Sequence, residues 1–287
     1  MQEPRPTWFK KLPEAQAILE APLPRSYLNF VGTWLLVFLD TVQGLMAFGL
    51  ITLGVAVTKS AVARRVVRPL IREQIYRAGV RLLPMITFLG MALGLIVIGQ
   101  TVSLMTRVGA QGYIGTVMVM VVVRELGPLL TALLVLARIG TATVVELGTA
   151  RALGEVEALE ALAIDPVHYL VVPRVIGLAV SVFALTVYLI LISLLSGYLF
   201  AFVQDVPLPP GEYVRQLAVA LRWEDFVLLA LKTIGFGLMI AVVTCFQGLA
   251  RALRIEEVPE ATTRAVVHAV VACVLLDALF LVVYLLI

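Results

Sequence analysis

Charge and cysteine are both scarce in this 287-residue sequence. Only 14% of the residues are charged, and there are two cysteines. Cys245 and Cys273 both lie inside apolar runs, with no CxxC pair and no neighbour at metal-ligand spacing, which indicates small core residues. The net charge is only +3, and the basic residues do not gather in aromatic-interleaved patches. This pattern argues against nucleic-acid binding.

Catalytic motifs are also missing. The sequence has no HExxH, no GxSxG and no cluster of His and Cys. The string GVAVTKS at Gly54 to Ser60 ends like a phosphate-binding loop but lacks both glycines that such a loop requires. The N-terminal residues show no removable targeting segment. We therefore predict that the chain is not an enzyme and binds neither a metal nor a cofactor.

Apolar residues, in contrast, are abundant. They make up 61% of the chain, and the mean hydropathy of +1.02 is typical of a multi-span membrane protein and excludes a soluble domain. Five apolar segments are long enough to cross a bilayer. The sequence therefore predicts an all-α integral membrane protein with transmembrane helices at about 82–104, 115–137, 174–203, 226–249 and 265–287.

The first 78 residues differ from the rest. A Pro-rich, basic lead-in (1–27) precedes the apolar run Leu28 to Val57, and a strongly basic stretch follows it. Because basic flanks prefer the cytoplasmic side, and both flanks here are basic, we expect the run to form an elbow or interfacial helix in the inner leaflet. The chain is thus predicted to comprise an N-terminal part, 1–78, and a five-helix transmembrane domain, 79–287.

Loop charges predict the orientation. The loop 250–264 holds three arginines and is expected inside, whereas 104–114 and 204–225 are expected outside. Starting from a cytoplasmic N-terminus, five crossings place the C-terminus on the extracytoplasmic side.

The segment between the second and third spans is acidic and falls on the cytoplasmic side. Leu153, Val156, Leu159 and Leu162 recur every three residues, which predicts a short helix, at about 150–163, with one apolar side. A proline ends it, because the residue before proline avoids the helical region. The helix is either a docking site for a cytoplasmic partner or a loop helix resting on headgroups, and its spacing favours neither. Its candidate docking residues are Glu155, Val156, Glu157, Leu159, Glu160 and Asp165.

Charges inside the apolar segments are the second candidate site. Arg124 and Glu125 fall near the middle of the second span, where each charge costs roughly 2.5–3.5 kcal/mol. Adjacent residues point about 100° apart on a helix, so the two cannot pair fully with each other. We expect partners on other spans, and Lys232 and Asp277 are available. The four groups are either functional or a structural network that holds the helices together.

Three smaller features carry structural expectations. Pro128 is predicted to kink the second span, because it removes a backbone hydrogen bond. The GxxxG pair Gly90 and Gly94 indicates a close helix contact. Thr262 is expected to cap the last span.

Four stretches, in this order, resemble a known family: RELGPLLTALLVLARIGTA from Arg124, ELGTAR from Glu146, EALEALAIDPVHYLVVPR from Glu157 and EATTRAVVHAVVACVLLD from Glu260. The sequence from about Gly79 to the C-terminus is similar to the permease subunits of Mla-type ABC lipid transporters, the MlaE/YrbE family. It departs from the family pattern at Ala137, where a glycine is usual, and at Ala163, where glycine commonly precedes Asp-Pro.

This resemblance implies an inner-membrane permease that moves phospholipids or related lipids between membranes and contributes to outer-membrane lipid asymmetry. The implied partners are a second copy of the chain, a cytoplasmic ABC ATPase dimer that binds ATP and Mg, a STAS-domain regulator in some systems, and a hexamer of MCE-domain proteins on the other face. The acidic helix would be the coupling helix. The implied lipid pocket would involve Val97, Leu104, Met105, Arg124, Glu125, Leu126, Lys232 and Asp277.

Two alternatives remain open from the residues alone. One is a secondary, ion-coupled transporter that uses Arg124, Glu125, Lys232 and Asp277 as a charge relay. The other is a scaffold in which the same charges only hold the bundle together.

Overall fold

The structure is a computed structural model that describes residues 25–58, 64–203, 209–249 and 254–286. The described residues are helical and include no strand. Contacts divide the chain into two units, residues 1–47 and 48–287. The helix α2, Arg25–Thr58, contains the predicted elbow run as one continuous helix. Of the expected lead-in, 1–27, residues 1–24 lie outside the described residues.

Five helical rods in the second unit are long and apolar enough to cross a membrane: Val67–Met105, Ile114–Ala152, Val167–Phe200, Trp223–Leu249 and Ile255–Leu286. The five predicted spans are therefore confirmed. All except the fourth extend well past their predicted apolar segments at one end, because the helical hydrogen bonding continues into polar residues. The basic helix α3, for example, leads into the first span.

These rods are built from shorter elements. The first contains α3 (Arg64–Ala78), η2 (Val80–Leu82), α4 (Leu83–Leu93), η3 (Gly94–Ile98) and α5 (Gly99–Val108). After η4 (Gln111–Tyr113), the second contains α6 (Ile114–Met118), η5 (Val119–Leu126), α7 (Gly127–Val135), η6 (Leu136–Gly140) and α8 (Thr141–Ala152). Then come α9 (Glu155–Ala161), η7 (Val167–Val171), α10 (Val172–Val203), α11 (Pro210–Ala220), α12 (Trp223–Leu249), η8 (Ile255–Glu257) and α13 (Val258–Leu286). The segments η3, η5, η6 and η7 are π-helical.

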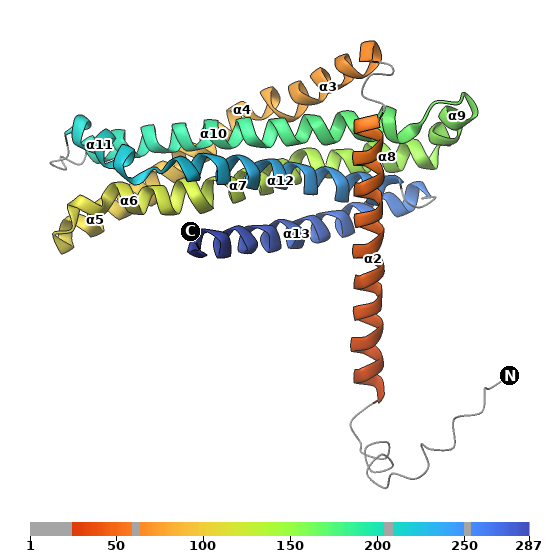
Figure 1. Cartoon of the computed structure of the whole chain (residues 1–287), viewed down its shortest axis with the longest axis horizontal. Helices are drawn as coiled ribbons and strands as arrows, with labels where there is room; N and C mark the ends of the chain where they lie inside the picture. The colour runs from red at the N-terminus through yellow and green to blue at the C-terminus, as the bar shows by residue number, and fades with distance from the viewer. Residues whose placement is uncertain (1–24, 59–63, 204–208, 250–253, 287) are drawn as a thin grey trace, which may run out of the picture. The chain divides into compact units, whose positions relative to one another are not determined.

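The helices α10 and α12 form the centre of the second unit (Figure 1). The first rod packs against α10, while α8 and α13 pack against α12. Backbones approach closely at small residues: a Cβ on Gly237 would lie 2.6 Å from Cα of Ala179, and one on Gly94 would collide with Ser193 and Ser196 of α10. The close contact predicted for the GxxxG pair is thus confirmed, and its partner is α10.

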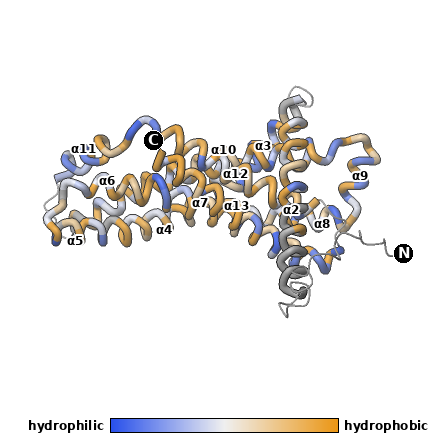
Figure 2. Tube along the Cα trace, turned by 60° about the horizontal axis from the view of Figure 1, so that its bottom comes forward, coloured by the Kyte–Doolittle hydropathy of each residue, from blue (hydrophilic) through white to orange (hydrophobic). Residues whose placement is uncertain are grey.

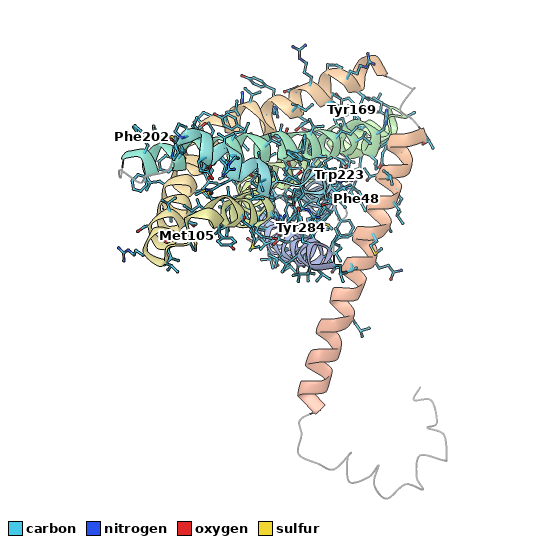
Figure 3. The ribbon with its side chains drawn as sticks, turned by 60° about the vertical axis from the view of Figure 1, so that its left-hand side comes forward. Phe48, Met105, Tyr169, Phe202, Trp223 and Tyr284 are labelled. Atoms are coloured by element: carbon cyan, nitrogen blue, oxygen red, sulfur yellow. The ribbon has the colours of Figure 1, made fainter. Side chains whose placement is uncertain are left out.

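The two ends of this bundle are polar and its middle is apolar (Figure 2). One end, called here the α9 end, carries α3 and α9, and the other, the α11 end, carries α11 and α5 (Figure 1). Figure 3 shows Tyr169 and Met105 toward these opposite ends. At the α11 end, burial raises the pKa of the Tyr213 hydroxyl, which donates to the Leu194 carbonyl at 3.1 Å and anchors α11.

Some local expectations were wrong. Helix α13 begins at Val258, ahead of Thr262, and directly follows η8, at whose start the Arg254 amide donates to Oε2 of Glu257 at 3.1 Å. Thr262 instead donates to the Val258 carbonyl within the helix. The acidic helix α9 is shorter than the predicted 150–163. Of its four regularly spaced apolar residues, Val156 is buried and Leu159 half-buried, while Leu153 and Leu162 lie beyond the helix ends and are exposed.

Candidate functional site

Lys232 is the centre of an ion-paired cluster inside the bundle. It comes from α12, and its side chain is fully buried. Its ammonium lies 3.0 Å from Oε2 of Glu125 and 2.7 Å from Oδ1 of Asp277. The cluster therefore joins the second, fourth and fifth spans. Glu125 has the ion-pair partner on another span that the cost of a charge in the membrane led us to expect.

The backbone of the second span also contributes to this cluster. Pro128 has no amide hydrogen, so it cannot donate to the carbonyl of Arg124, four residues earlier. The Lys232 ammonium donates to that carbonyl at 2.8 Å. The π-helical segment η5 precedes Pro128. At its end the Gly127 amide donates to the carbonyl of Val122, five residues earlier, instead of to the residue four earlier. π-Helical turns of this kind are frequent at functional sites.

Arg124 points to a different partner. Its guanidinium binds the Asp225 carboxylate with Nε 2.9 Å from Oδ1 and Nη2 3.2 Å from Oδ2. It also lies over the Tyr284 ring, 5.1 Å from the centroid. Asp225 is only 3% exposed and accepts from the Arg222 amide at the start of α12. This ion pair, with one hydrogen bond from Nη2, connects the start of the fourth span to the second.

The charges of the cluster do not balance. Two cations, Arg124 and Lys232, face three carboxylates, Glu125, Asp225 and Asp277, so the formal sum is 2 − 3 = −1. The excess lies at Lys232, which two carboxylates share. Glu125 and Asp277 keep 27% and 19% of their side-chain surface exposed. Part of each of these two carboxylate side chains is therefore accessible from outside the cluster.

The other predicted pocket residues lie apart from these ions. Leu126 is half-buried beside Glu125. Val97 is half-buried in η3, which packs on α10, and Leu104 is 57% exposed. Met105 packs against the buried cluster of Val102, Ile114, Met118 and Tyr213 at the α11 end. Among the described residues, Val97, Leu104 and Met105 therefore do not belong to the ion-paired cluster around Lys232.

The acidic helix α9 forms a separate site at the opposite end. Gly154, with φ +78°, begins it, and Glu157 pairs with Arg151 of α8 at 3.3 Å. Val156 is buried beneath it, whereas Glu155 and Glu160 are exposed. Asp165 caps the next element, since its Oδ1 accepts from the Val167 amide at 3.0 Å. A mostly apolar cavity of about 280 Å³ lies between α9 and the ends of the neighbouring spans.

The comparison with protein families decides the relationship. The family model described as "Permease MlaE" matches residues 71–283, which include nearly all of the five spans, α9 and the ion-paired cluster. This chain belongs to the MlaE permease family.

Curated relatives agree with this assignment. A probable ABC transporter permease protein of Rickettsia prowazekii (strain Madrid E) is 30% identical over 200 residues, covering 70% of this permease and 77% of the relative. The intermembrane phospholipid transport system permease protein MlaE of Haemophilus influenzae is 26% identical over 87% of this chain and 95% of its own. TRIGALACTOSYLDIACYLGLYCEROL 1 of Arabidopsis thaliana, a chloroplastic protein, is 32% identical over 67% of this chain and 53% of its own. With its five apolar helices, this member of the family is a multi-pass inner-membrane protein.

Sequence reasoning missed two charged residues of the permease. Hydropathy places Asp225 at the end of the loop 204–225, although an acid just inside a helix start suggests a capping partner. The second is Glu146 of α8. It lies 3.1 Å from Arg174 of α10 and 3.4 Å from Arg77 of α3, so it connects three helices at the α9 end.

Proposed function

We propose that this chain is the transmembrane permease of an ABC transporter that moves phospholipids or related lipids between membranes. The observation that carries the proposal is the match of the permease family to residues 71–283. The printed names of relatives, which include an ABC transporter permease and a phospholipid transport permease, support it. In this proposal a separate ATPase dimer binds ATP and Mg, and the permease itself holds no cofactor.

The proposed assembly contains two copies of the chain, the ATPase dimer at the α9 end and an MCE-domain hexamer at the α11 end, with a STAS-domain regulator as an additional subunit in some systems. The α9 end is then cytoplasmic, which agrees with the basic residues of α3. Helix α9 suits docking because its exposed carboxylates lie on a helix anchored by the buried Val156. The docking residues are Glu155, Val156, Glu157, Leu159, Glu160 and Asp165.

The proposed lipid pocket lies where Glu125 and Asp277 retain an accessible side next to the buried Lys232, with Arg124 and Leu126 beside them. The polar groups suit a headgroup, and the apolar side chains toward the α11 end, Val97, Leu104 and Met105, suit acyl chains. ATP-driven movement of α9 would be transmitted along the second and third spans to this pocket.

The docking role is tested by charge reversal. The double variant Glu157→Lys, Glu160→Lys is expected to lose co-purification of the ATPase subunit, because a cationic α9 no longer matches the same surface. The matched control is Glu256→Lys, which reverses an exposed acid in η8 outside α9 and should leave co-purification unchanged. Intact assembly of the double variant would contradict the docking role.

A second candidate function is an ion-coupled transporter. The uneven charge at Lys232, which two carboxylates share, favours it because a proton relay needs a group that can change its protonation. This candidate requires the purified chain alone to move lipid in liposomes with an imposed proton gradient. The ABC proposal requires transport to depend on the ATPase and on ATP.

A further inference from the structure

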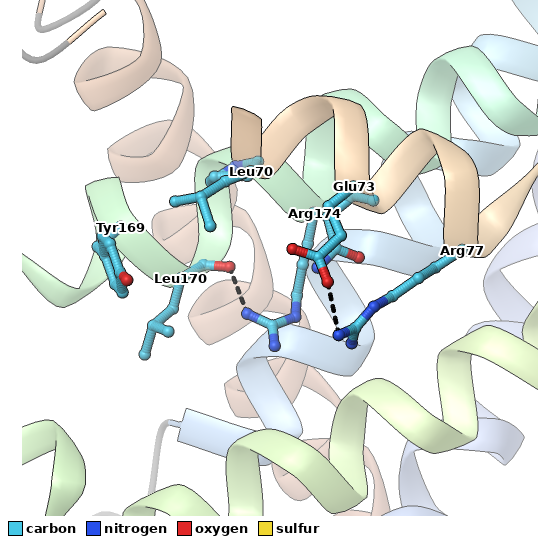
Figure 4. Close-up of a pocket in the computed structure, with 8 residues that line it drawn as sticks. Leu70, Glu73, Arg77, Tyr169, Leu170 and Arg174 are labelled. Atoms are coloured by element: carbon cyan, nitrogen blue, oxygen red, sulfur yellow. Dashed lines mark hydrogen bonds and ion pairs between the residues drawn. The ribbon is translucent and has the colours of Figure 1, made fainter. Parts of the chain in front are cut away.

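A cavity of about 160 Å³ opens between α3 and the start of the third span (Figure 4); it adjoins the cavity beside α9, with which it shares Tyr169 and Leu170. Its lining combines two arginines and one carboxylate with apolar side chains: Leu70, Glu73 and Arg77 come from α3, and Leu170 and Arg174 from the facing rod. The volume equals that of roughly five liquid waters. A phosphate group with part of an attached glycerol fits such a space.

Arg174 lines this cavity and has an unused hydrogen-bond donor. Its side chain is only 12% exposed. Nη1 donates to the Leu170 carbonyl at 2.7 Å and Nη2 to Glu146 at 3.1 Å, but the buried Nε has no hydrogen-bond partner among the described residues. A buried unsatisfied guanidinium N–H requires an explanation. An anion that the structure does not contain would satisfy it.

The second arginine is held loosely. Arg77 donates to Glu73 at 2.7 Å and to Glu146 at 3.4 Å. The side chains of Glu73 and Glu146 are 53% and 48% exposed, so these ion pairs are water-screened and weak. A phosphate can replace a carboxylate as the partner of Arg77 at little cost, and arginine suits bidentate phosphate binding.

The two cavity arginines are balanced by Glu73 and Glu146, and the excess positive charge lies on the surface beside the cavity. Arg68, Arg72 and Arg81 are exposed on the adjoining α3 and η2, and Arg81 lies over the Tyr76 ring at 5.8 Å. These cations attract anionic headgroups and disfavour a choline or ethanolamine ammonium placed beside them. The basic side of a membrane protein also faces the cytoplasmic leaflet.

We propose that this cavity binds the phosphate of an anionic phospholipid from the cytoplasmic leaflet, with Arg77 and Arg174 as the phosphate ligands and Leu70 and Leu170 against its glycerol region. The lipid is a bound ligand that joins α3 to the third span. Its site is separate from the proposed transport pocket at Lys232, and its occupancy does not depend on transport.

The test uses the full chain in nanodiscs of phosphatidylcholine with a minor fraction of phosphatidylglycerol. Native mass spectrometry measures which lipids remain bound. The wild type should retain phosphatidylglycerol preferentially, and Arg77→Gln should lower that retention about tenfold, the effect of losing one charge-assisted hydrogen bond. Leu70→Trp keeps both arginines, fills the cavity and should give the same loss.

The matched control is Arg72→Gln, which removes the same charge from an exposed position of α3 that does not line the cavity. It should change retention by less than about twofold, as expected for a screened surface charge. Equal losses from Arg72→Gln and Arg77→Gln, full retention in Leu70→Trp, or no preference in the wild type would overturn the proposal. Displacement of the lipid by millimolar inorganic phosphate would also overturn it, because the site would then bind a free ion.

Discussion

Among single residues, Lys232 is expected to contribute strongly to stability. It is fully buried, and it separates two carboxylates that would otherwise repel each other. Lys232→Met should therefore destabilise the bundle by about 3–5 kcal/mol, the cost of leaving a buried charge without its partner. Thermal unfolding of the purified chain in detergent measures the loss. A midpoint equal to that of the wild type would contradict the central role of this ion pair.

A neutral version of the cluster separates stability from function. In the triple variant Glu125→Gln, Lys232→Met, Asp277→Asn no charge is left unpaired at this position, so most of the lost stability should return. If lipid transport stays absent while the unfolding midpoint recovers, the charges have a role in transport. If transport recovers together with the midpoint, the charges only hold the spans together.

Ala163 carries backbone strain that a substitution can remove. Its φ is +57°, and it is the one non-glycine residue with positive φ in the described part of the chain. This conformation costs an L-residue roughly 1–2 kcal/mol and costs glycine nothing. Ala163→Gly should therefore stabilise the chain. The gain should be at most about 1 kcal/mol, because the greater freedom of glycine in the unfolded state offsets part of the relieved strain.

The control for this variant is Ala161→Gly at the end of α9. There the backbone is helical, so glycine should destabilise by about 0.5–1 kcal/mol. Opposite shifts in the unfolding midpoint are expected from these two changes, which lie two residues apart. A loss of stability in both variants would show that Ala163 is unstrained.

At the scale of elements, the crossing of α10 and α12 depends on one missing side chain. A Cβ on Gly237 would meet Cα of Ala179 at 2.6 Å and the Leu178 carbonyl at 2.8 Å, and these backbone atoms cannot rotate away. Gly237→Ala should force the helices apart and cost about 1–3 kcal/mol. Gly235→Ala, on the same helix, meets only the Leu276 side-chain end at 3.1 Å and should cost much less. Thermal unfolding measures the stability of both variants, and equal midpoints would contradict the close crossing.

Elements also differ in how far the sequence predicts them. The five spans follow from long apolar segments, and the Glu125–Lys232–Asp277 cluster follows from the cost of unpaired charge in a membrane. The π-helical segments could not be predicted, because their residues have the same propensities as residues of an α-helix. The longest of them, η5, also depends on the contacts of Arg124 and on Pro128. The pairing of Asp225 with Arg124 depends on where α12 begins, which hydropathy locates only to within a few residues.

For the whole molecule, the number of crossings determines which surfaces meet the ATPase and which meet the opposite compartment. Helices α9 and α11 are separated by a single span, Val167–Phe200, so they must lie on opposite sides of the membrane. The basic residues of α3 accompany α9 at one end of the bundle, and this predicts that the α9 end is cytoplasmic.

Cysteine labelling tests this orientation directly. Cys245 and Cys273 are fully buried and should not react, so a single added cysteine reports its own position. A membrane-impermeant maleimide applied to spheroplasts should label Val219→Cys, which is 80% exposed on α11, and should leave Glu160→Cys on α9 unlabelled. Inside-out vesicles should reverse the pattern. Labelling of both positions from one side would mean that the third rod does not cross the membrane, while a fully inverted pattern would place α9 beyond the reach of any cytoplasmic ATPase.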